Sequence, residues 1–233
     1  MCLIITKQIN GEVNWQAADR AARINRDGYG VAYVSTKGNL VFKKSMKWNV
    51  VKARAQALEK ANKPFVLHQR YATNGAVTIA NTHPFRLENH GMLMAHNGII
   101  DSLHIPQGKS DTAVLAEHID SVFPRGFISD DKSLATIENL LGGYSKLAFL
   151  DKLGQIHIVN EDLGEWIDGA WYSVVGTVSR VTNADAYNPK TWATPITGTI
   201  DDTATLIQDE FGTYAPDEWL ESYNSRRAKK LNS

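Results

Sequence analysis

Short strand-like segments fill the first two thirds of this 233-residue chain. They are rich in β-branched and aromatic residues, and they lie at residues 2–6, 29–35, 40–44, 65–70, 92–96 and 147–151. Apolar residues at helical spacing occur between them, at residues 14–24, 49–60, 111–122 and 133–141. Because the strands come in hairpin-like pairs and the helices are inserted irregularly, the sequence favours stacked layers over a regular βαβ repeat.

Asn14 and Ser110 stand at the beginnings of two expected helices, where each side chain can cap the first turn. No internal repeat, low-complexity tract or Pro/Gly/Ser linker divides the chain, and its 43% hydrophobic residues can bury a sizeable core. We therefore expect a single domain over residues 1–233, with residues 181–233 as a C-terminal extension or docking segment. That segment predicts a strand or two, a short helix near residues 216–225, and a basic, solvated tail.

Charge and cysteine content exclude several classes of function. Lys plus Arg and Asp plus Glu both number 25, so the net charge is zero, and we expect no direct binding to nucleic acid or to an anionic membrane. One cysteine excludes an internal disulfide and a Cys-rich zinc site. The seven histidines form no HExxH or similar pattern, so neither a metal nor a cofactor is expected. The absence of a signal peptide and of an apolar run of about 18 residues predicts a cytoplasmic protein.

Four polar segments interrupt the apolar pattern. The first, "NRDGYG" at residues 25–30, is a tight turn by its Asp-Gly pair, and it lacks the ligand positions and the terminal Glu of a calcium loop. The second, residues 68–85, places Arg70 at a strand end, where its guanidinium fork can bind a carboxylate. A surface salt bridge is the alternative for Arg70. His83 precedes a proline in the same segment, so we expect a turn or packing role for it.

The third and fourth segments each allow a structural and a functional interpretation. "MAHNGII" at residues 94–100 runs from a strand into Asn97-Gly98, which is a strong turn dipeptide. An Asn amide beside a Gly backbone N–H is also the composition of an oxyanion hole. In the fourth segment, residues 109–119, Asp111 stands in a first helical turn and is favourable there for the helix dipole. The same carboxylate can hold the ammonium group of a substrate.

Cys2 is the only cysteine, and it directly follows the initiator methionine. One interpretation is a small residue that is easily buried at the start of the first strand. The other is chemical. Once Met1 is removed, Cys2 carries a free α-amine, whose pKa of roughly 7.7–8.0 suits it to accept the proton of its own thiol. Position alone leaves both interpretations open.

Taken in chain order, five features resemble the class II glutamine amidotransferases, which use an N-terminal nucleophile. They are Cys2, "RYATNG" (70–75), "NTHPF" (81–85), "AHNGII" (95–100) and "SDT" (110–112). "GGYSKLAFLD" at residues 142–151 is similar to the strand that follows in that family, so the resemblance covers about residues 2–151. Each motif is weak alone, but the family order and family-like gaps identify Cys2 as a catalytic nucleophile.

The resemblance implies an α+β fold, namely a four-layer α/β/β/α sandwich of two mainly antiparallel sheets, as in N-terminal-nucleophile hydrolases. It implies a glutaminase domain that releases ammonia from the glutamine side chain through a thioester on Cys2, with Asn97 and the Gly98 N–H as the oxyanion hole. The substrate-binding residues that it implies are Arg70 for the α-carboxylate, Asp111 for the α-ammonium, and Thr73 as a lining of the glutamine pocket.

The sequence departs from the family pattern at Leu3, where many members have Gly, at Asn74, which replaces a His common in the sugar-forming members, and at Tyr71, which replaces their Trp. The lid over the glutamine is therefore not carried over. No synthase, isomerase or nucleotide-binding module is recognisable, so we expect a stand-alone glutaminase domain with a separate synthetase or modifying enzyme as the ammonia acceptor. Two alternatives stay open: an amidohydrolase of the same superfamily acting on another amide, and a non-catalytic binding module.

Overall fold

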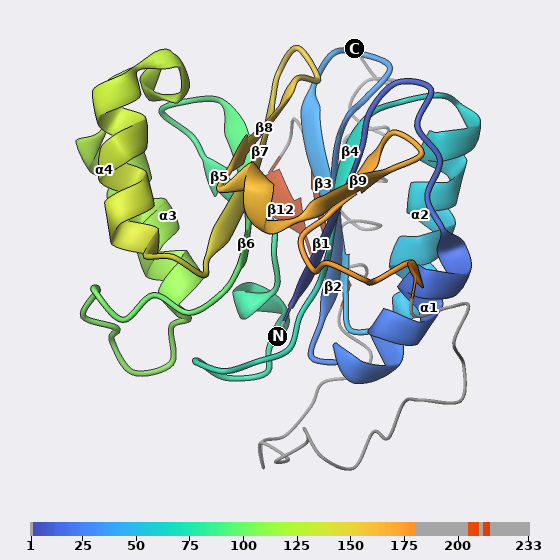
Figure 1. Cartoon of the computed structure of the whole chain (residues 1–233), viewed down its shortest axis with the longest axis horizontal. Coiled ribbons are helices and arrows are strands. Elements are labelled where there is room, and N and C mark those ends of the chain that lie inside the picture. Colours follow the sequence, from blue (N-terminus) through green and yellow to red (C-terminus); the bar gives the residue numbers. More distant parts are fainter. Residues whose placement is uncertain (1, 180–204, 210–211, 215–233) are drawn as a thin grey trace, which may run out of the picture.

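The computed structural model describes residues 2–179, 205–209 and 212–214, which form two β-sheets (Figure 1). The larger sheet contains, in spatial order, β12 (Gly212–Tyr214), β11 (Thr205–Asp209), β3 (Leu40–Ser45), β2 (Tyr29–Val34), β4 (Phe65–Gln69), β1 (Leu3–Lys7), β10 (Ala170–Tyr172) and β9 (Glu165–Ile167). The smaller sheet contains β5 (Phe85–Leu87), β6 (Met92–Asn97), β7 (Lys146–Asp151) and β8 (Ile156–Val159). Neighbouring strands pair antiparallel in both sheets.

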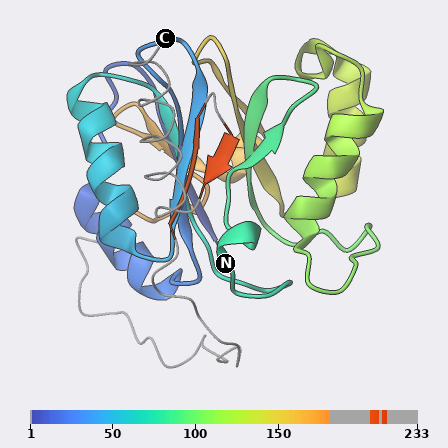
Figure 2. The ribbon, with the colours of Figure 1, turned by 180° about the vertical axis from the view of Figure 1, so that it is seen from behind.

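Helices cover the outer face of each sheet. α1 (Trp15–Ile24) and α2 (Trp48–Lys60) lie against the larger sheet, while α3 (Asp111–Val122) and α4 (Asp131–Leu141) lie against the smaller one (Figures 1 and 2). The arrangement is the four-layer α/β/β/α sandwich that the resemblance implied, and that prediction of the fold is confirmed. Within the described part of the chain, no helix combines the length and apolar character that crossing a bilayer requires.

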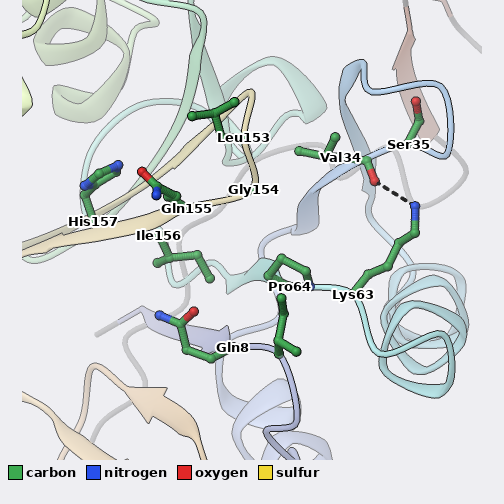
Figure 3. A pocket seen from close by; sticks show the side chains of 11 residues that line it. Gln8, Val34, Ser35, Lys63, Pro64, Leu153, Gly154, Gln155, Ile156 and His157 are labelled. Carbon is green, nitrogen blue, oxygen red and sulfur yellow. Dashed lines mark hydrogen bonds between the residues drawn. The ribbon is translucent and has the colours of Figure 1, made fainter.

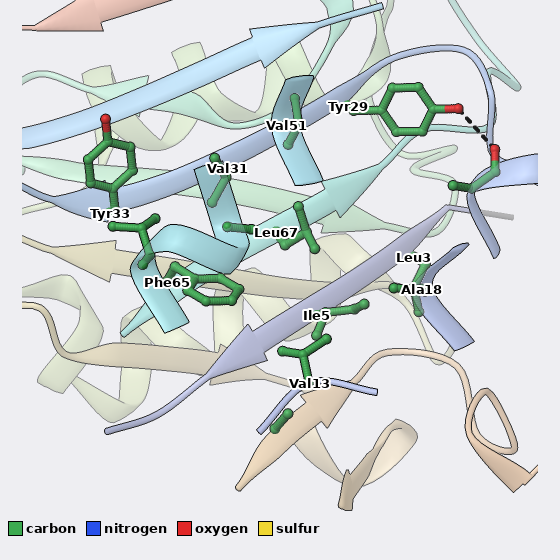
Figure 4. Packing of buried hydrophobic residues seen from close by; sticks show 14 of the residues in the cluster. Leu3, Ile5, Val13, Ala18, Tyr29, Val31, Tyr33, Val51, Phe65 and Leu67 are labelled. Atoms are coloured by element: carbon green, nitrogen blue, oxygen red, sulfur yellow. Dashed lines mark hydrogen bonds between the residues drawn. The ribbon is translucent and has the colours of Figure 1, made fainter. Parts of the chain in front are cut away.

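Three apolar layers hold the sandwich together. Between the larger sheet and its two helices, the strand residues that face the helices pack against Ala18, Ala22 and Val51. Figure 4 shows part of this cluster. Between the two sheets lies a second cluster, which includes Ile4, Phe42 and Trp171 from the larger sheet and Leu93, Ala95, Ala148 and Leu150 from the smaller one. A third cluster fills the space between the smaller sheet and α3 and α4. Side chains on alternate strand positions therefore reach both faces of each sheet, as expected for strands buried on two sides.

Local sequence signals place the helices as expected. The side chains of Asn14 and Ser110 each accept a hydrogen bond from the backbone N–H three residues on, at 2.9 and 3.2 Å. Helix α4 begins two residues before the expected start, because Asp130 caps it by accepting from the Ser133 N–H at 2.9 Å. The six expected strands are also present, with ends that differ by at most one residue.

Several short strands were not expected from the sequence. β5, β9 and β10 have three residues and β8 has four, which is too short for an alternating pattern to be recognised. They are defined by pairing with longer strands, as when β10 pairs with β1. β11 and β12 lie in the segment where a strand or two was expected, and β11 pairs with the edge of β3. The helix expected near residues 216–225 and the basic tail lie outside the described residues.

Candidate active site

Cys2 lies immediately before β1, partly buried, with its thiol against the backbone of Tyr71. Its Sγ accepts a hydrogen bond from the Tyr71 N–H at 3.3 Å, and it lies 3.4 Å from the Tyr71 carbonyl oxygen, to which the S–H can donate. Burial raises the pKa of the Cys2 thiol, and the hydrogen bond to the Tyr71 backbone opposes that rise. The thiol therefore needs a base beside it before it can act as a thiolate at neutral pH.

Arg70 directly follows β4, and it is the buried arginine beside the thiol, with 2% of its surface exposed. Its guanidinium donates to the carbonyl oxygens of Asn74 at 2.9 Å and Ala76 at 3.1 Å. These bonds hold the loop after β4 around the guanidinium and use only part of its five N–H donors. Thr73 lies on this loop with its side chain exposed to solvent.

Asn97 is the last residue of β6, and it is fully buried. Its Nδ2 donates to the Ser173 hydroxyl at 2.8 Å, while its Oδ1 has no hydrogen-bond partner among the described residues. Gly98 follows with φ +150°, where a Cβ would lie 2.1 Å from Ser145 Oγ and 2.6 Å from Ser145 Cα. The Ser145 hydroxyl donates to the Ile99 carbonyl oxygen at 2.9 Å, so this serine packs directly on the Asn97-Gly98 turn.

Asp111 is the first residue of α3, and its carboxylate accepts three hydrogen bonds from neighbouring residues. One oxygen accepts from the Ile100 N–H at 3.2 Å, and the other accepts from the Thr112 N–H at 2.8 Å and the Thr112 hydroxyl at 3.3 Å. Because that hydroxyl donates its single proton to Asp111, it accepts from the Nδ1–H of His96, 2.9 Å away. This chain of bonds fixes the carboxylate next to the Asn97-Gly98 turn.

The predicted site residues thus converge from four segments of the chain. Burial lowers the pKa of Arg70, and the charges of Cys2, Asp27 and Asp111 oppose that change. Conversely, Arg70 and Asp111 act on the pKa of the Cys2 thiol in opposite directions. These groups are therefore near enough for their charges to interact. Thr73 is the one predicted residue for which the structure gives only its position on the loop that Arg70 holds.

Asp27 also lies at this site, although its Asp-Gly pair in the sequence predicts only a tight turn. Its carboxylate accepts from the Ala72 N–H at 2.8 Å, and its backbone N–H donates to the Arg70 carbonyl oxygen at 2.9 Å. The backbone N–H of Arg70 in turn donates to the carbonyl oxygen of Gly28 at 2.8 Å. The "NRDGYG" turn therefore secures the segment that carries Arg70. Its Asp-Gly signal predicts the turn but not this partner, which is more than 40 residues away in the sequence.

Three buried histidines, His68, His83 and His96, lie close to one another next to the site residues. The centroids of the His68 and His83 rings are 3.9 Å apart, and His83 Nδ1 accepts a hydrogen bond from the backbone N–H of His96 at 3.2 Å. His68 Nε2 lies 3.0 Å from the His96 carbonyl oxygen, to which it donates. A Cβ on Gly30 would lie 1.9 Å from the carbonyl oxygen of His83, so the glycine makes room for this cluster. The packing role expected for His83 is what the structure shows.

Burial keeps all three imidazoles neutral. It lowers the pKa of His68 to about 3 and of His96 to about 4, and it lowers that of His83 well below its ordinary value. Two ring nitrogens, His68 Nδ1 and His96 Nε2, have no hydrogen-bond partner among the described residues. A proton added to any of these rings would have to be accommodated in the interior of the sandwich.

We expect the free energy of unfolding to fall steeply from about pH 6.5 to about pH 4. In this window the unfolded chain protonates its histidines at their ordinary pKa of about 6.5, while the folded chain does not, so stability is lost as the pH falls. Each histidine contributes up to about 1.4 kcal/mol per pH unit, and three contribute about 4. Urea unfolding at half-unit steps of pH measures the slope.

A matched variant identifies the source of this acid sensitivity. His68→Gln keeps an N–H donor for the His96 carbonyl oxygen but removes one titrating ring. Its unfolding free energy should depend on pH with a slope lower by about a third in the same window. An unchanged slope would show that the buried imidazoles are not its cause.

A cavity of about 560 Å³ opens at the far end of the strands from Cys2 (Figure 3). It is lined by Gln8, which follows β1, by the Lys63–Pro64 turn before β4, and by the β7–β8 hairpin. A strand of five residues separates it from the thiol by roughly 20 Å, so this cavity is not part of the candidate site. Among the residues that the structure describes, no group of three or more His, Cys, Asp or Glu side chains is arranged to hold a metal ion.

Comparison with known proteins gives the family. Residues 6–118 match the family model of the class II glutamine amidotransferases. The chain matches this family over 113 of its 233 residues. The matched range includes Arg70, Thr73, Asn97, Gly98 and Asp111, and it begins after Cys2.

Two relatives are longer proteins, of which this chain matches only a part. The chain is 28% identical over 162 residues to the glutamine–fructose-6-phosphate aminotransferase (isomerizing) of Sulfurisphaera tokodaii. This alignment covers 65% of this chain and 28% of that protein. The chain is 33% identical over 107 residues to the protein of the same name from Bradyrhizobium diazoefficiens, covering 41% of this chain and 16% of the relative. The chain therefore spans less than a third of the length of these relatives.

Solved structures include the glutamine phosphoribosylpyrophosphate amidotransferase from B. subtilis in complex with ADP and GMP. It superposes with a TM-score of 0.48 at 19% identity, over 92% of this chain and 48% of that one. A glutamine aminotransferase class-II domain protein from Silicibacter pomeroyi superposes with a TM-score of 0.38 at 14% identity, over 93% and 99% of the two chains.

Proposed function

We propose that this domain hydrolyses the side-chain amide of glutamine, with Cys2 as the nucleophile after removal of Met1. The observation that carries the proposal is that four candidate groups lie at the same end of the two sheets. A thiol at the start of β1, a buried arginine at the end of β4, an Asn-Gly turn at the end of β6 and a carboxylate at the start of α3 lie together. Amide hydrolysis with a covalent intermediate needs a nucleophile, a base and oxyanion donors. This set would supply the nucleophile and the donors, and the α-amine that Cys2 carries once Met1 is removed would supply the base.

The reaction begins with proton transfer from the Cys2 thiol to its own α-amine. Because burial raises the pKa of the thiol, an adjacent base is required, and the free amine titrates close to neutral pH. The thiolate attacks the amide carbon, and the negative charge on oxygen is stabilised by Asn97 Nδ2 and the Gly98 N–H. The ammonium of Cys2 then protonates the leaving ammonia, and water hydrolyses the thioester to glutamate.

The α-carboxylate and the α-ammonium of the substrate are bound by charged side chains. We assign the α-carboxylate to Arg70, whose guanidinium keeps donors beyond the two that bind Asn74 and Ala76. We assign the α-ammonium to Asp111, and a place along the glutamine pocket to Thr73. A site with both charges selects an amino acid over a simple amide, which is the reason to favour glutamine over another amide substrate.

The intact mass of the purified protein tests this proposal directly. Loss of Met1 lowers the mass by one methionine residue, and a diazoketone analogue of glutamine should then add one equivalent to the Cys2 thiol. Excess glutamine should slow this labelling, whereas the matched simple amide, which lacks both α-groups, should not. A chain that keeps Met1 or that is not labelled would rule out the N-terminal nucleophile, and a folded but inert chain would favour the binding-module alternative.

We further propose that the ammonia is delivered to an acceptor site on another domain or protein. Ammonia is mostly protonated at neutral pH and is then a poor nucleophile, so uncoupled hydrolysis would waste glutamine. We expect low basal glutaminase activity that rises when a synthetase or modifying enzyme is bound. The tagged protein, purified from its host, is assayed before and after co-purifying proteins are stripped. Full activity in the clean monomer would leave a plain glutaminase.

A further inference from the structure

Ser173 follows β10 and is fully buried between the two sheets. Its hydroxyl accepts from the Ile4 N–H at 2.8 Å, and its own backbone N–H donates to the Ile4 carbonyl oxygen at 3.0 Å. The same hydroxyl bonds the Asn97 amide at 2.8 Å. One side chain therefore joins β1, two residues after the thiol, to the final residue of β6.

These contacts relate two groups that belong to different sheets. Cys2 stands before β1 of the larger sheet, and Asn97 ends β6 of the smaller one. The relative position of nucleophile and oxyanion donor thus depends on contacts across the interior of the sandwich. Ser173 provides such a contact with hydrogen bonds, whereas the surrounding cluster of Ile4, Leu93 and Trp171 provides only apolar packing.

Resting on the proposed function, we propose that Ser173 is a positioning residue that orients the Asn97 amide for the oxyanion. The amide group has two N–H donors and one acceptor. When the Ser173 hydroxyl holds one N–H, rotation about the terminal torsion is restricted. The second N–H has only the long contact of Nδ2 with the Ser173 carbonyl oxygen at 3.5 Å, so it is available to the substrate oxygen. The Ser173 hydroxyl oxygen accepts from the Ile4 N–H and from Asn97 Nδ2, so the amide is held with its nitrogen towards the serine.

Alanine at position 173 would keep the backbone bond between residue 173 and Ile4 but remove both hydroxyl contacts. The Asn97 amide, already without a partner for Oδ1 among the described residues, would lose its remaining side-chain anchor. Oxyanion donors contribute because they are oriented before the reaction, and removal of one costs about 100- to 1000-fold in kcat. We expect disorientation to cost less than removal, so Ser173→Ala should lower kcat roughly 10- to 100-fold.

A purely structural role would affect stability without this kinetic pattern. For Ser173→Ala, KM for glutamine and the dissociation constant of glutamate should change less than about twofold, because neither depends on the oxyanion donors. Ser133→Ala is the matched control, since it removes a serine hydroxyl bond, to Asp130 at 2.6 Å, at the far side of the smaller sheet. It should lower the melting temperature and leave kcat unchanged.

An aldehyde analogue of glutamine separates the oxyanion site from the substrate clamp. The Cys2 thiol adds to the aldehyde carbon, so that the S–C bond forms, the carbonyl π bond breaks, and the oxygen occupies the oxyanion site and takes up the proton that the thiol gives up. Its inhibition constant should rise by about the same factor as kcat falls in Ser173→Ala. In Asn97→Ala, adding Ser173→Ala should cause no further loss of kcat, because the serine acts through the amide.

Wild-type protein alone provides a measurement that does not depend on a variant folding. In an NMR spectrum of the Asn97 side-chain amide, aldehyde binding should shift one N–H strongly and leave the N–H held by Ser173 nearly unmoved. Equal shifts of both protons, or a Ser173→Ala variant that hydrolyses glutamine with wild-type kcat, would overturn the positioning role. If the wild type neither hydrolyses glutamine nor binds the aldehyde, it is the proposed function that fails.

Discussion

A Cys2→Ala variant is expected to fold normally and to lose glutamine hydrolysis by about three orders of magnitude or more. The thiol is partly buried and its hydrogen bonds are to the backbone of Tyr71, so its removal opens little space and leaves no charged group without a partner. Without a nucleophile no thioester forms, and the remaining oxyanion donors and substrate clamp can act only on direct attack by water. The measurement is ammonia release under saturating glutamine.

Two controls keep this prediction from resting on misfolding. The unfolding free energy of Cys2→Ala, measured in urea, should lie within about 1 kcal/mol of that of the wild type. Glutamate should still bind through Arg70 and Asp111. Cys2→Ser should retain little activity, because a hydroxyl is far harder to ionise than a thiol. If Cys2→Ala kept a tenth of wild-type turnover, the nucleophile would have to be another residue.

Elements with strong local signals were predictable from the sequence. The helix beginning at Asp111 follows from Ser110 as its cap, and the helix beginning at Trp15 follows from Asn14. Long strands such as β2 and β7 follow from continuous runs of apolar and β-branched residues. In these segments the local preference and the burial required by the sandwich agree, so residue order alone is informative.

The rest of the candidate site depends on contacts between segments far apart in the chain. Ser173 bonds Asn97 across 76 positions and Ile4 across 169, and Asp27 bonds Ala72 across 45. Nothing in the local pattern around Ser173 or Asp27 specifies these partners, because a serine after a strand and an Asp-Gly turn are common. Strand β10, which carries Ser173 to its place, is itself defined only by pairing with β1.

The second large effect is expected from Arg70→Lys, which keeps the positive charge and removes the planar fork. Arg70 is buried, and its guanidinium donates to Asn74 and Ala76 while its charge interacts with that of Asp111. A lysine ammonium cannot make the two loop bonds and a paired contact with a carboxylate at the same geometry. We expect kcat/KM for glutamine to fall about 100-fold, which corresponds to about 2.7 kcal/mol.

The design of this test separates binding of the α-carboxylate from the loop that Arg70 holds. Arg86→Lys is the matched control, because Arg86 is partly buried and, like Arg70, donates to a backbone carbonyl, that of Leu40 at 2.7 Å, away from the thiol. It should leave kcat/KM within about twofold of the wild-type value.

With a glutamine analogue that lacks the α-carboxylate, wild type and Arg70→Lys should be almost equally slow, because the group that distinguishes them is gone. If Arg70→Lys were instead as defective with that analogue as with glutamine, relative to wild type, the arginine would act by shaping the loop around Thr73 and not by binding the carboxylate. A simple primary amide cleaved by the wild type as fast as glutamine would remove the need for a clamp altogether, and the domain would then be an amidohydrolase of broader specificity.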